Sequence, residues 1–341
     1  MKIAFVYNLQ RKAGSTQNSF DQEEVEYDAP DTVDGIKRAI EANGHEVILI
    51  EADRSCFGKL AKLEGKVDLV FNIAEGVTGD ARESQVPTYC EVLKLPYTHS
   101  TPTCHAISLN KMVCKTILSA SGIRVPRSII IKPGETIEEI ELKFPLILKP
   151  NTEGSSKGIF DANVVDDIDR MNQRARELWG NGVDTDLLAE EFIDGREFTT
   201  ALIGNDEVLV LPIVEQKFDF LPDNMRNIAG FELKWIYEDK LKDLQEAYDC
   251  PAKLTQKQKK EIEDVSKMIY RILNVRDCAR IDYRMDRDGR LYFIEVNTLP
   301  GMIPDEKVIS YFPLAARVGG ISYHKLIGLI IDNAIGRYRG K

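Results

Sequence analysis

A β-hairpin near the C-terminal end constrains the fold of this 341-residue chain more than any other feature. Its two strands read CARIDYRMD and RLYFIEVN, and between them lies Asp288-Gly289, a dipeptide typical of two-residue hairpin turns. With that turn, Arg287 faces Arg290, and Asp282 lies directly opposite Glu295. Because side chains alternate along a strand, the sequence predicts that both carboxylates point to one face.

The same face is a candidate metal site. Arg280 and Asn297 join Asp282 and Glu295 there, and apolar neighbours indicate that the other face is buried (Ile281, Ile294, Val296). Facing carboxylates, with Cβ atoms roughly 5 Å apart, repel each other unless a cation lies between them. Two carboxylates and an amide oxygen are hard ligands that suit Mg²⁺, which also binds phosphates. The alternative is a solvated face on which Arg280 and Arg284 neutralise the acids.

Residues 1–108 alternate strands and helices. The strands are KIAFVYN, HEVILIEA and DLVFNIA, and the helix spans 32–43, capped by Asp31 and stopped by Asn43-Gly44. This pattern predicts an N-terminal Rossmann-like domain, a parallel sheet covered by helices on both sides. Ligands of such sheets lie at the carboxyl ends of the strands. The segment EGVTG, which begins at Glu75, follows the third strand and is expected at that edge.

The rest of the chain predicts two α+β domains, 109–200 and 201–341. The first has a helix capped by Ser108 and closed by Gly122, a short helix near Glu135, a helix at about 166–179, and the strands SIIIK, FPLILKP, LLAEEFI and EFTTALIG. The second has the strand EVLVLPIV, a long polar stretch at 216–254, a helix at 255–273, the hairpin, and a last helix at about 323–337. A polar stretch of that length is usually a functional loop or an insertion.

Composition excludes several classes of protein. The formal net charge is −10 and no basic run is present, which argues against nucleic acid as a partner. The six cysteines include no C-x-x-C pair, so neither a zinc site nor a disulfide framework is indicated. No apolar run approaches the roughly 18 residues of a membrane span, and the start does not read as a secretory signal. We therefore expect a cytoplasmic protein without membrane contact.

Several lysines and acids lie where a nucleotide could bind. Lys149 ends the apolar run PLILKP, and the loop GSSKG at 154–158 follows it. Glycines let a backbone approach a phosphate closely, although most Gly/Ser loops are only loops, and this one is not a Walker A motif. Taken alone, Lys111 reads as a surface lysine, and Glu190-Glu191 reads as a solvated strand edge.

Together these residues resemble the ATP-grasp enzymes and, among them, the D-alanine–D-alanine ligase family. The most specific stretch is ARID followed by EVNTLPGM at 295–302, which looks like the family's R-x-D and E-x-N-T-x-P-G signature. LPYTHS and KPNTEGSSKG are similar to two further motifs of the family. The resemblance runs from DLVFNIAEG to the last helix, so it implies the ATP-grasp fold, with ATP held between the two α+β domains.

The resemblance implies roles at the hairpin and the substrates. Asp282, Glu295 and Asn297 match the ligands of two Mg²⁺ ions, with Mn²⁺ as the alternative metal and Glu295 bridging both ions. Arg280 matches the arginine that stabilises the oxyanion of the tetrahedral intermediate. Gly301 is assigned to the substrate, and Ser310 matches the serine that holds the acceptor's carboxylate, although four extra residues precede it.

The resemblance also implies a set of residues that bind ATP or cover it. They are the two ATP-binding lysines, the adenine-contacting hinge, the ribose-binding acid, the γ-phosphate lysine and two serines of a covering loop: Lys111, Lys149, Glu190, Glu191, Ile193, Glu197, Lys234, Ser155 and Ser156. The catalytic candidates are Arg280, Ser155, Lys234 and Glu75. Family members are commonly dimers, so a homodimer is implied.

Where amino acids would bind, the chain departs from the family. Glu75-Gly76 stands where D-alanine ligases have His-Gly, and Trp235 replaces a tyrosine. The family's first glycine-rich loop, with an acid for the substrate's amino group, is replaced by the segment 8–31, which contains three glutamates (Glu23, Glu24, Glu26). D-alanine, another amino acid and a peptide all remain candidate substrates. Glu75 predicts a positive group on one of them; the alternative is that Glu75 pairs with Arg82 or Lys111.

The expected reaction starts with attack of a carboxylate on the γ-phosphate of ATP, and an amine then attacks the acyl phosphate. Such an intermediate hydrolyses readily, so we expect a lid, formed by the 155–157 loop or the 216–240 stretch. A nucleotide-binding domain without catalysis would be favoured by loss of a metal ligand, and no such loss is found. A dinucleotide oxidoreductase is disfavoured because no G-x-G-x-x-G follows the first strand.

Overall fold

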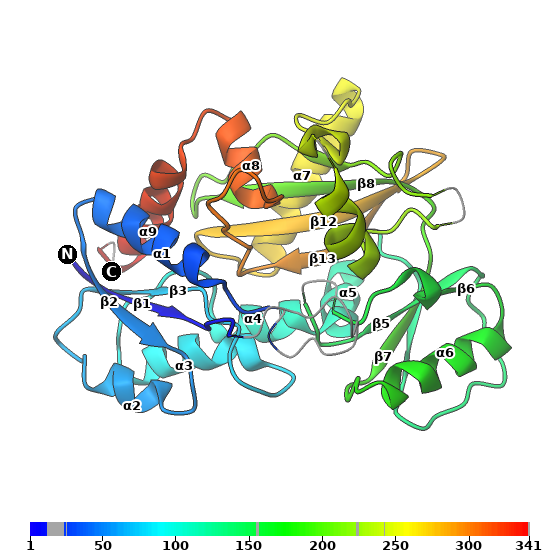
Figure 1. The fold of residues 1–341 in the computed structure, drawn as a ribbon, viewed down its shortest axis with the longest axis horizontal. Helices are drawn as coiled ribbons and strands as arrows, with labels where there is room; N and C mark the ends of the chain where they lie inside the picture. The colour runs from blue at the N-terminus through cyan, green and yellow to red at the C-terminus, as the bar shows by residue number, and fades with distance from the viewer. Residues whose placement is uncertain (12–23, 25, 155–156, 223–224, 242, 340–341) are drawn as a thin grey trace.

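The computed structural model describes residues 1–341 except 12–23, 25, 155–156, 223–224, 242 and 340–341. Within the described residues the strands form three sheets, arranged as in Figure 1. The first sheet lies at the N-terminal side, the second on the opposite side of the molecule, and the third spans the region between and above them. The architecture therefore combines a parallel α/β unit with antiparallel α+β units, as predicted.

The first sheet is parallel and has the order β2-β1-β3, which confirms the Rossmann-like prediction. Its strands are β1 (Lys2–Tyr7), β2 (Glu46–Glu51) and β3 (Leu69–Asn72). Alternate residues of β1 enter different cores: Ile3 and Phe5 pack in the core that includes α1 (Pro30–Ala42), and Ala4 and Val6 in the core that includes α2 (Cys56–Ala61) and α3 (Gln85–Val92). Burial on both faces explains the continuous apolar run of this strand.

The start of α1 differs from the prediction. Ala29 is the N-cap residue, Pro30 begins the helix, and Asp31 lies in the first turn without making a capping hydrogen bond. Proline suits the first helical position because its fixed φ matches the helix and its missing N–H has no partner there. An acid in the first turn remains favourable for the helix dipole.

The second sheet is antiparallel, with the order β4-β7-β5-β6. Its strands are β4 (Ser128–Ile131), β5 (Leu146–Pro150), β6 (Val164–Val165) and β7 (Leu187–Glu191), and α6 (Ile168–Gly180) packs on it. Two helices precede the sheet, α4 (Pro102–Leu109) and α5 (Lys111–Ala120).

Two helix predictions in this region were wrong. Ser108 lies inside α4, and Asn110 caps α5 by accepting a hydrogen bond from the Val113 N–H at 3.0 Å. The chain around Glu135 forms a turn in which the Glu135 carboxylate accepts a hydrogen bond from the Lys132 N–H at 2.8 Å. A side chain that bonds the backbone locally in this way competes with helix formation.

The third sheet has the order β11-β10-β8-β12-β13, and β9 pairs with β8. The bounds are β8 (Gly195–Ile203), β9 (Leu209–Val210), β10 (Val214–Gln216), β11 (Tyr248–Asp249), β12 (Cys278–Asp286) and β13 (Leu291–Asn297). The single strand expected for EVLVLPIV is divided into β9 and β10, with Pro212 between them. β8 spans the proposed domain boundary at residue 200 and belongs by its pairing to this sheet.

Three long helices complete this unit: α7 (Gln256–Ile272), α8 (Tyr311–Val318) and α9 (Tyr323–Arg339). Short helical turns lie between the larger elements: η1 (Arg82–Ser84), η2 (Asp161–Asn163), η3 (Leu233–Tyr237), η4 (Glu238–Lys240) and η5 (Leu244–Glu246). α7 begins with a capping box between Thr255 and Gln258. α8 and α9 share one core with β1, β3 and α1, so the third unit is packed directly on the first.

No single helix within the described ranges is long and apolar enough to cross a membrane. α8 and α9 meet the length and composition criteria only as a pair, and that pair is bent by 103°.

Candidate active site

The hairpin of β12 and β13 has the predicted register at the candidate metal site. Asp282 lies opposite Glu295, and Arg280 lies opposite Asn297. The turn, however, contains three residues instead of two: the Asp286 N–H donates to the Arg290 carbonyl at 3.0 Å, and Gly289 has φ of 79°. This is the three-residue hairpin with a glycine in the left-handed region.

A β-bulge corrects the effect of the longer turn. Near the turn, Tyr283 pairs with Phe293, which is one residue out of the predicted register. The register then shifts between Asp282 and Tyr283, where Ile294 is the extra residue of β13. The prediction that the two carboxylates face each other is therefore confirmed, but the turn that was expected to fix them is wrong. Bulges often lie beside active sites, because they redirect side chains.

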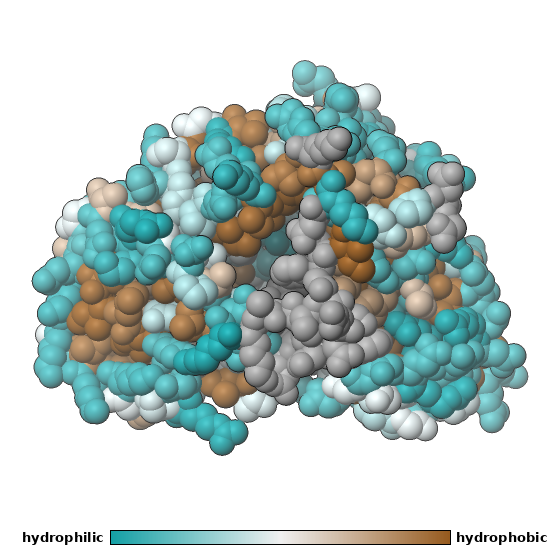
Figure 2. Space-filling view, viewed as in Figure 1, coloured by the Kyte–Doolittle hydropathy of each residue, from teal (hydrophilic) through white to brown (hydrophobic). Residues whose placement is uncertain are grey.

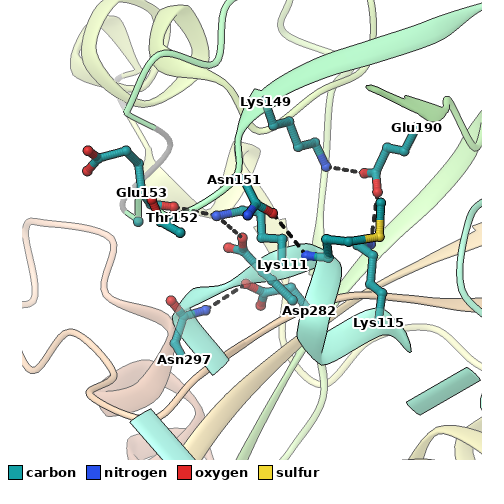
Figure 3. A network of polar contacts seen from close by, with 12 residues as sticks. Lys111, Lys115, Lys149, Asn151, Thr152, Glu153, Glu190, Asp282 and Asn297 are labelled. Carbon is teal, nitrogen blue, oxygen red and sulfur yellow. Dashed lines mark hydrogen bonds and ion pairs between the residues drawn. The ribbon is translucent and has the colours of Figure 1, made fainter. Parts of the chain in front are cut away.

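Asp282 is the centre of a small polar network on this face. It accepts a hydrogen bond from Asn297 Nδ2 at 3.3 Å (Figure 3). It also accepts one from Thr199 Oγ1 at 2.8 Å, and its Oδ2 lies 2.9 Å from Arg280 Nη2. Glu295 Oε1 lies 4.0 Å from Arg280 Nη2. Arg280 therefore balances part of the acidic charge, as the alternative interpretation of this face required.

The donor set fits Mg²⁺ provided that phosphate and water complete the coordination. The side chains of Asp282 and Glu295 are 13% and 27% exposed, so both are partly open, and their neighbours Arg280 and Asn297 line a cavity. Within the described ranges no group of three or more His, Cys, Asp or Glu side chains gathers as a metal cluster. Two carboxylates and one amide match the preference of Mg²⁺ for few protein ligands together with waters and substrate phosphates.

Lys111 is buried beside this network and is not a surface lysine. It is the first residue of α5, and its Nζ donates a hydrogen bond to the Glu153 carbonyl (Figure 3). The same atom lies 3.9 Å from Glu295 Oε2. The backbone N–H of Lys111 donates to the Asn151 carbonyl at 3.0 Å. The start of α5 is thus joined to the beginning of the glycine loop.

Lys149 and Glu190 form a buried ion pair with a third residue, Lys115. Lys149 Nζ lies 2.5 Å from Glu190 Oε1, and Lys115 Nζ lies 2.9 Å from Glu190 Oε2 (Figure 3). The side chains are 10%, 1% and 2% exposed in the order Lys149, Glu190, Lys115. Burial acts to raise the pKa of Glu190, but the two lysines outweigh it and lower that pKa to about 2.

Sequence reasoning missed Lys115 and placed Glu190 on a solvated edge. The available signal was that Lys115 lies four residues after Lys111 on one helix and therefore points to the same side. The neighbouring acid, Glu191, accepts a hydrogen bond from the Lys143 N–H at 3.0 Å. Ile193 lies half-buried in the connection between β7 and β8.

The structure describes some of the remaining predicted site residues and leaves others outside the described part of the chain. Ser310, which precedes α8, donates its hydroxyl hydrogen to the Gly301 carbonyl at 3.0 Å, so these two substrate candidates are in contact. Glu197 lies on β8 and pairs with Arg284. Lys234 lies in η3, and its side chain is outside the description. Ser155 and Ser156 lie outside the described residues.

A cavity of about 870 Å³ brings the first and third units together. Arg280, Asn297, Gly301 and Ser310 line it from the third unit. The first unit contributes four carboxylates, Glu26, Asp28, Glu75 and Glu83, called here the acidic wall. Figure 2 shows the molecule hollowed near the centre of this face. The cavity therefore has the candidate reaction site on one side and the acidic wall on the other.

Glu75 makes neither of the ion pairs considered as its alternative. Arg82 Nη2 lies 2.6 Å from Glu26 Oε2 and 3.1 Å from Glu153 Oε2, and Lys111 contacts Glu153 and Glu295 as described. Burial is the main reason that the pKa of Glu75 is well above its usual range, and the carboxylates of Glu83 and Glu26 raise it further. A cationic group beside Glu75 would therefore be stabilised.

Arg82 also connects the acidic wall to the glycine loop. Its Nη1 donates to the Thr152 carbonyl at 2.7 Å, and its partner Glu26 accepts a hydrogen bond from the Gly154 N–H at 2.6 Å. Gly76 makes this packing sterically feasible: its φ is 89°, and a Cβ there would lie 2.2 Å from the Arg82 carbonyl oxygen. The sequence analysis noted Glu26 as one of three glutamates in the segment 8–31. It could not predict the contact with Arg82, because the two residues are far apart in the sequence.

Comparison with known proteins agrees with this geometry. Residues 120–332 match the family model described as D-ala D-ala ligase C-terminus. The chain is 34% identical to an uncharacterized protein, y4sG, of Sinorhizobium fredii, over 90% of this chain and 88% of that protein. It is 30% identical to the D-alanine–D-alanine ligase of Aquifex aeolicus, over 87% of this chain and 92% of that protein.

The fold is also that of a solved structure. The crystal structure of the D-alanine–D-alanine ligase from Bacillus anthracis complexed with ATP superimposes with a TM-score of 0.73 at 23% identity, covering 100% of this chain and 99% of that chain. At that identity the likeness establishes the fold, while the family model and the curated relative establish the family. The chain has the ATP-grasp fold and belongs to the D-alanine–D-alanine ligase family.

Proposed function

We propose that the chain is an ATP-dependent ligase that joins a carboxylate to an amine through an acyl phosphate. The observation that carries the proposal is the position of Arg280, Asp282, Glu295 and Asn297 on one face of the third sheet, beside the cavity. A catalyst of this reaction must neutralise phosphate charge and stabilise an oxyanion a few ångströms away. These four side chains provide both functions within two adjacent strands.

Asp282, Glu295 and Asn297 are the proposed ligands of two Mg²⁺ ions, with Mn²⁺ as the alternative metal. The metal ions would supply charge neutralisation at the transferring phosphate. Arg280 is the proposed oxyanion donor, because its guanidinium lines the cavity. One such donor typically contributes about 3 kcal/mol to transition-state stabilisation.

Lys111 and Lys149 are the proposed ATP lysines, and the hinge residues Glu190, Glu191 and Ile193 are proposed to contact adenine. Since both carboxylate oxygens of Glu190 are engaged by lysines, its contribution to adenine would come through the backbone. Glu197 is proposed for the ribose. The remaining proposals rest on the family resemblance: Lys234 for the γ-phosphate, and Ser155 and Ser156 in a loop that covers the site.

The amino-acid substrates are proposed to lie in the cavity between the acidic wall and Arg280. Ser310, in contact with Gly301, would hold the acceptor's carboxylate. Glu75 would hold a positive group of one substrate, either an α-amino group or a basic side chain. The lack of an ion pair at Glu75 within the described chain and its position on the cavity support this role.

The proposed organisation has three units, 1–108, 109–200 and 201–341. The lid would come from the 155–157 loop or the 216–240 stretch. We propose a homodimer from the family resemblance and a cytoplasmic location from the composition.

The reaction class is tested by a phosphate-release screen of amino-acid pairs with ATP and Mg²⁺, with products identified by mass spectrometry. We expect at least one pair to release inorganic phosphate and to give a product whose mass is the sum of both substrates minus water. ATP binding without phosphate release for any pair, dipeptides included, would favour a nucleotide-binding protein without ligase activity.

Replacing Glu75 by histidine is expected to change the substrate profile in this screen. The substitution removes the carboxylate, so substrates with a cationic group near Glu75 should lose a charge-assisted hydrogen bond. We expect those substrates to react less, by about tenfold or more in kcat/KM, and D-alanine to gain. Full activity with an unchanged profile would return Glu75 to a purely structural role.

A further inference from the structure

Arg284 is a buried arginine for which the proposed mechanism has no use. It lies on β12 two residues beyond Asp282, so it occupies the same face of the sheet as Asp282 and Arg280. Only 6% of the residue is exposed. The sequence interpretation gave it a neutralising role toward the metal-binding acids, but its contacts are with a different carboxylate.

The contacts of Arg284 centre on Glu197. Arg284 lies directly opposite Glu197 in the pairing of β12 with β8, and its Nη1 donates to Glu197 Oε2 at 3.2 Å. Its Nη2 donates to the Gly195 carbonyl at 3.1 Å. The guanidinium carbon lies 4.8 Å from the ring centre of Phe192 and 6.0 Å from that of Phe218. Two hydrogen bonds and two aromatic rings therefore fix the orientation of the Arg284 guanidinium and its distance from the Glu197 carboxylate.

Burying the charged side chain of Arg284 costs free energy, and packing alone would not require a charge at this position. Arg284 is a charged side chain held in the interior, and the neighbouring carboxylate of Glu197 offsets part of the cost of burying it. The Nε atom is buried and has no hydrogen-bond partner within the described chain. Replacing a buried ion pair by apolar side chains of similar volume is often neutral or stabilising, so packing alone does not require an arginine between two phenylalanine rings.

Arg284 also lies at the junction of the proposed nucleotide-binding elements. Phe192 belongs to the hinge between Glu191 and Ile193, and Phe218 follows β10 at the start of the 216–240 stretch. A guanidinium between these rings joins the hinge to the strand that carries the metal-binding acids. Its orientation therefore determines how Glu197 is presented.

We propose that Arg284 is a positioning residue that holds the carboxylate of Glu197 in the orientation needed to accept hydrogen bonds from the ribose hydroxyls of the nucleotide. The proposal rests on the proposed function, in which Glu197 faces the ribose. Arg284 thereby sets the preference of this site for a ribonucleotide over a nucleotide that lacks both hydroxyls. The guanidinium is planar by its own delocalisation. Its burial beside the aromatic rings keeps water away from it, which strengthens its interaction with Glu197.

The test compares the dissociation constants of ATP and 2′,3′-dideoxy-ATP, measured by calorimetry with Mg²⁺ on the full-length chain. The wild type is expected to bind ATP at least about tenfold more tightly, since hydrogen bonds to a charged acceptor are lost with the hydroxyls. Arg284→Met should weaken ATP binding and leave dideoxy-ATP binding nearly unchanged, so that the ratio falls below about threefold. Glu197→Gln should reduce the ratio in the same way.

Arg196→Met is the matched control. Arg196 also pairs with a glutamate, Glu215, and also stacks on a ring, that of Phe198, but it lies elsewhere on β8 and is partly exposed. Its replacement should leave the ratio at the wild-type value. If Arg284 had a purely structural role, its replacement would weaken the binding of both nucleotides equally. The ratio of the two dissociation constants would then stay at the wild-type value.

Two outcomes would overturn the inference: an unchanged ratio in Arg284→Met, or a wild type that does not discriminate between the two nucleotides. If Arg284→Met does not fold, Arg284→Lys decides, because it keeps the charge but loses the planar two-donor geometry. That variant should fall between the wild type and Glu197→Gln, and a wild-type ratio would contradict the proposal. A wild type that binds neither nucleotide would instead contradict the proposed function.

Discussion

Replacing Glu295 by glutamine is expected to abolish ATP-dependent product formation and to leave the fold intact. The substitution keeps the shape of the side chain but removes the charge proposed to bridge two metal ions. Glu295 faces Asp282 across the hairpin and lies 3.9 Å from Lys111 Nζ, so the lost charge affects the proposed metal ligands and the proposed ATP-binding lysine Lys111 together. A lost charge contact of this kind costs more than about 1.5 kcal/mol, which is more than about a tenfold loss in rate.

Product formation is measured by mass spectrometry, and the fold by circular dichroism and the melting temperature. Glu215→Gln is the matched control, since Glu215 is also a glutamate in the third sheet but pairs with Arg196. The control should keep full activity. Activity of Glu295→Gln within about threefold of the wild type would show that the proposed metal site is wrong.

Replacing Glu190 by leucine is expected to cause the largest loss of stability. Glu190 is 1% exposed and is the shared partner of Lys115 and Lys149, so its removal leaves two buried ammonium groups without their counter-charge. Breaking a buried ion pair by removing one partner typically costs about 3–5 kcal/mol. The free energy of unfolding, measured by urea denaturation, should fall by an amount in that range.

The neighbouring substitution Glu191→Gln is the control for stability. Glu191 lies half-buried beside the largely exposed Arg127, and an exposed ion pair contributes about 1 kcal/mol or less. A free energy of unfolding for Glu190→Leu equal to that of Glu191→Gln would contradict the role given to the Lys–Glu–Lys cluster.

The cluster also predicts a pH dependence. The pKa of Glu190 is lowered to about 2 in the folded protein, from an ordinary value of 4.5, so the unfolded chain binds its proton more readily. Its stabilising contribution is therefore complete above about pH 4.5 and is lost as the pH falls toward 2. Between pH 5 and pH 3 the wild type should lose more stability than Glu190→Leu.

The sequence predicts the parallel sheet and the shared face of Asp282 and Glu295, the candidate metal site, because both follow from the periodicity of side chains along strands. β1, β2 and β3 are apolar runs separated by turn residues, and that pattern is local. The facing of Asp282 and Glu295 was predicted correctly from an incorrect turn. A three-residue turn moved the register by one residue and the bulge at Ile294 moved it back, which no propensity rule anticipates.

Contacts between distant segments could not be predicted. Lys115 meets Glu190 only because α5 packs against the second sheet, and Arg82 meets Glu153 only where two units touch. Such ion pairs depend on tertiary packing, so Glu190 was interpreted from the sequence as part of a solvated strand edge. The position of Glu75 at the end of β3 was predictable from topology, whereas the other members of the acidic wall required the structure.

Ligation through an acyl phosphate is tested most directly by following oxygen atoms in the wild-type reaction. The substrate pair found in the screen is supplied with ¹⁸O in the carboxylate that becomes the amide, together with ATP and Mg²⁺. Attack of that carboxylate on the γ-phosphate, followed by attack of the amine on carbon, transfers one labelled oxygen to the released inorganic phosphate and leaves the other in the amide. We therefore predict one ¹⁸O atom per phosphate, measured by mass spectrometry. Unlabelled phosphate, or label found in AMP, would contradict the proposed reaction.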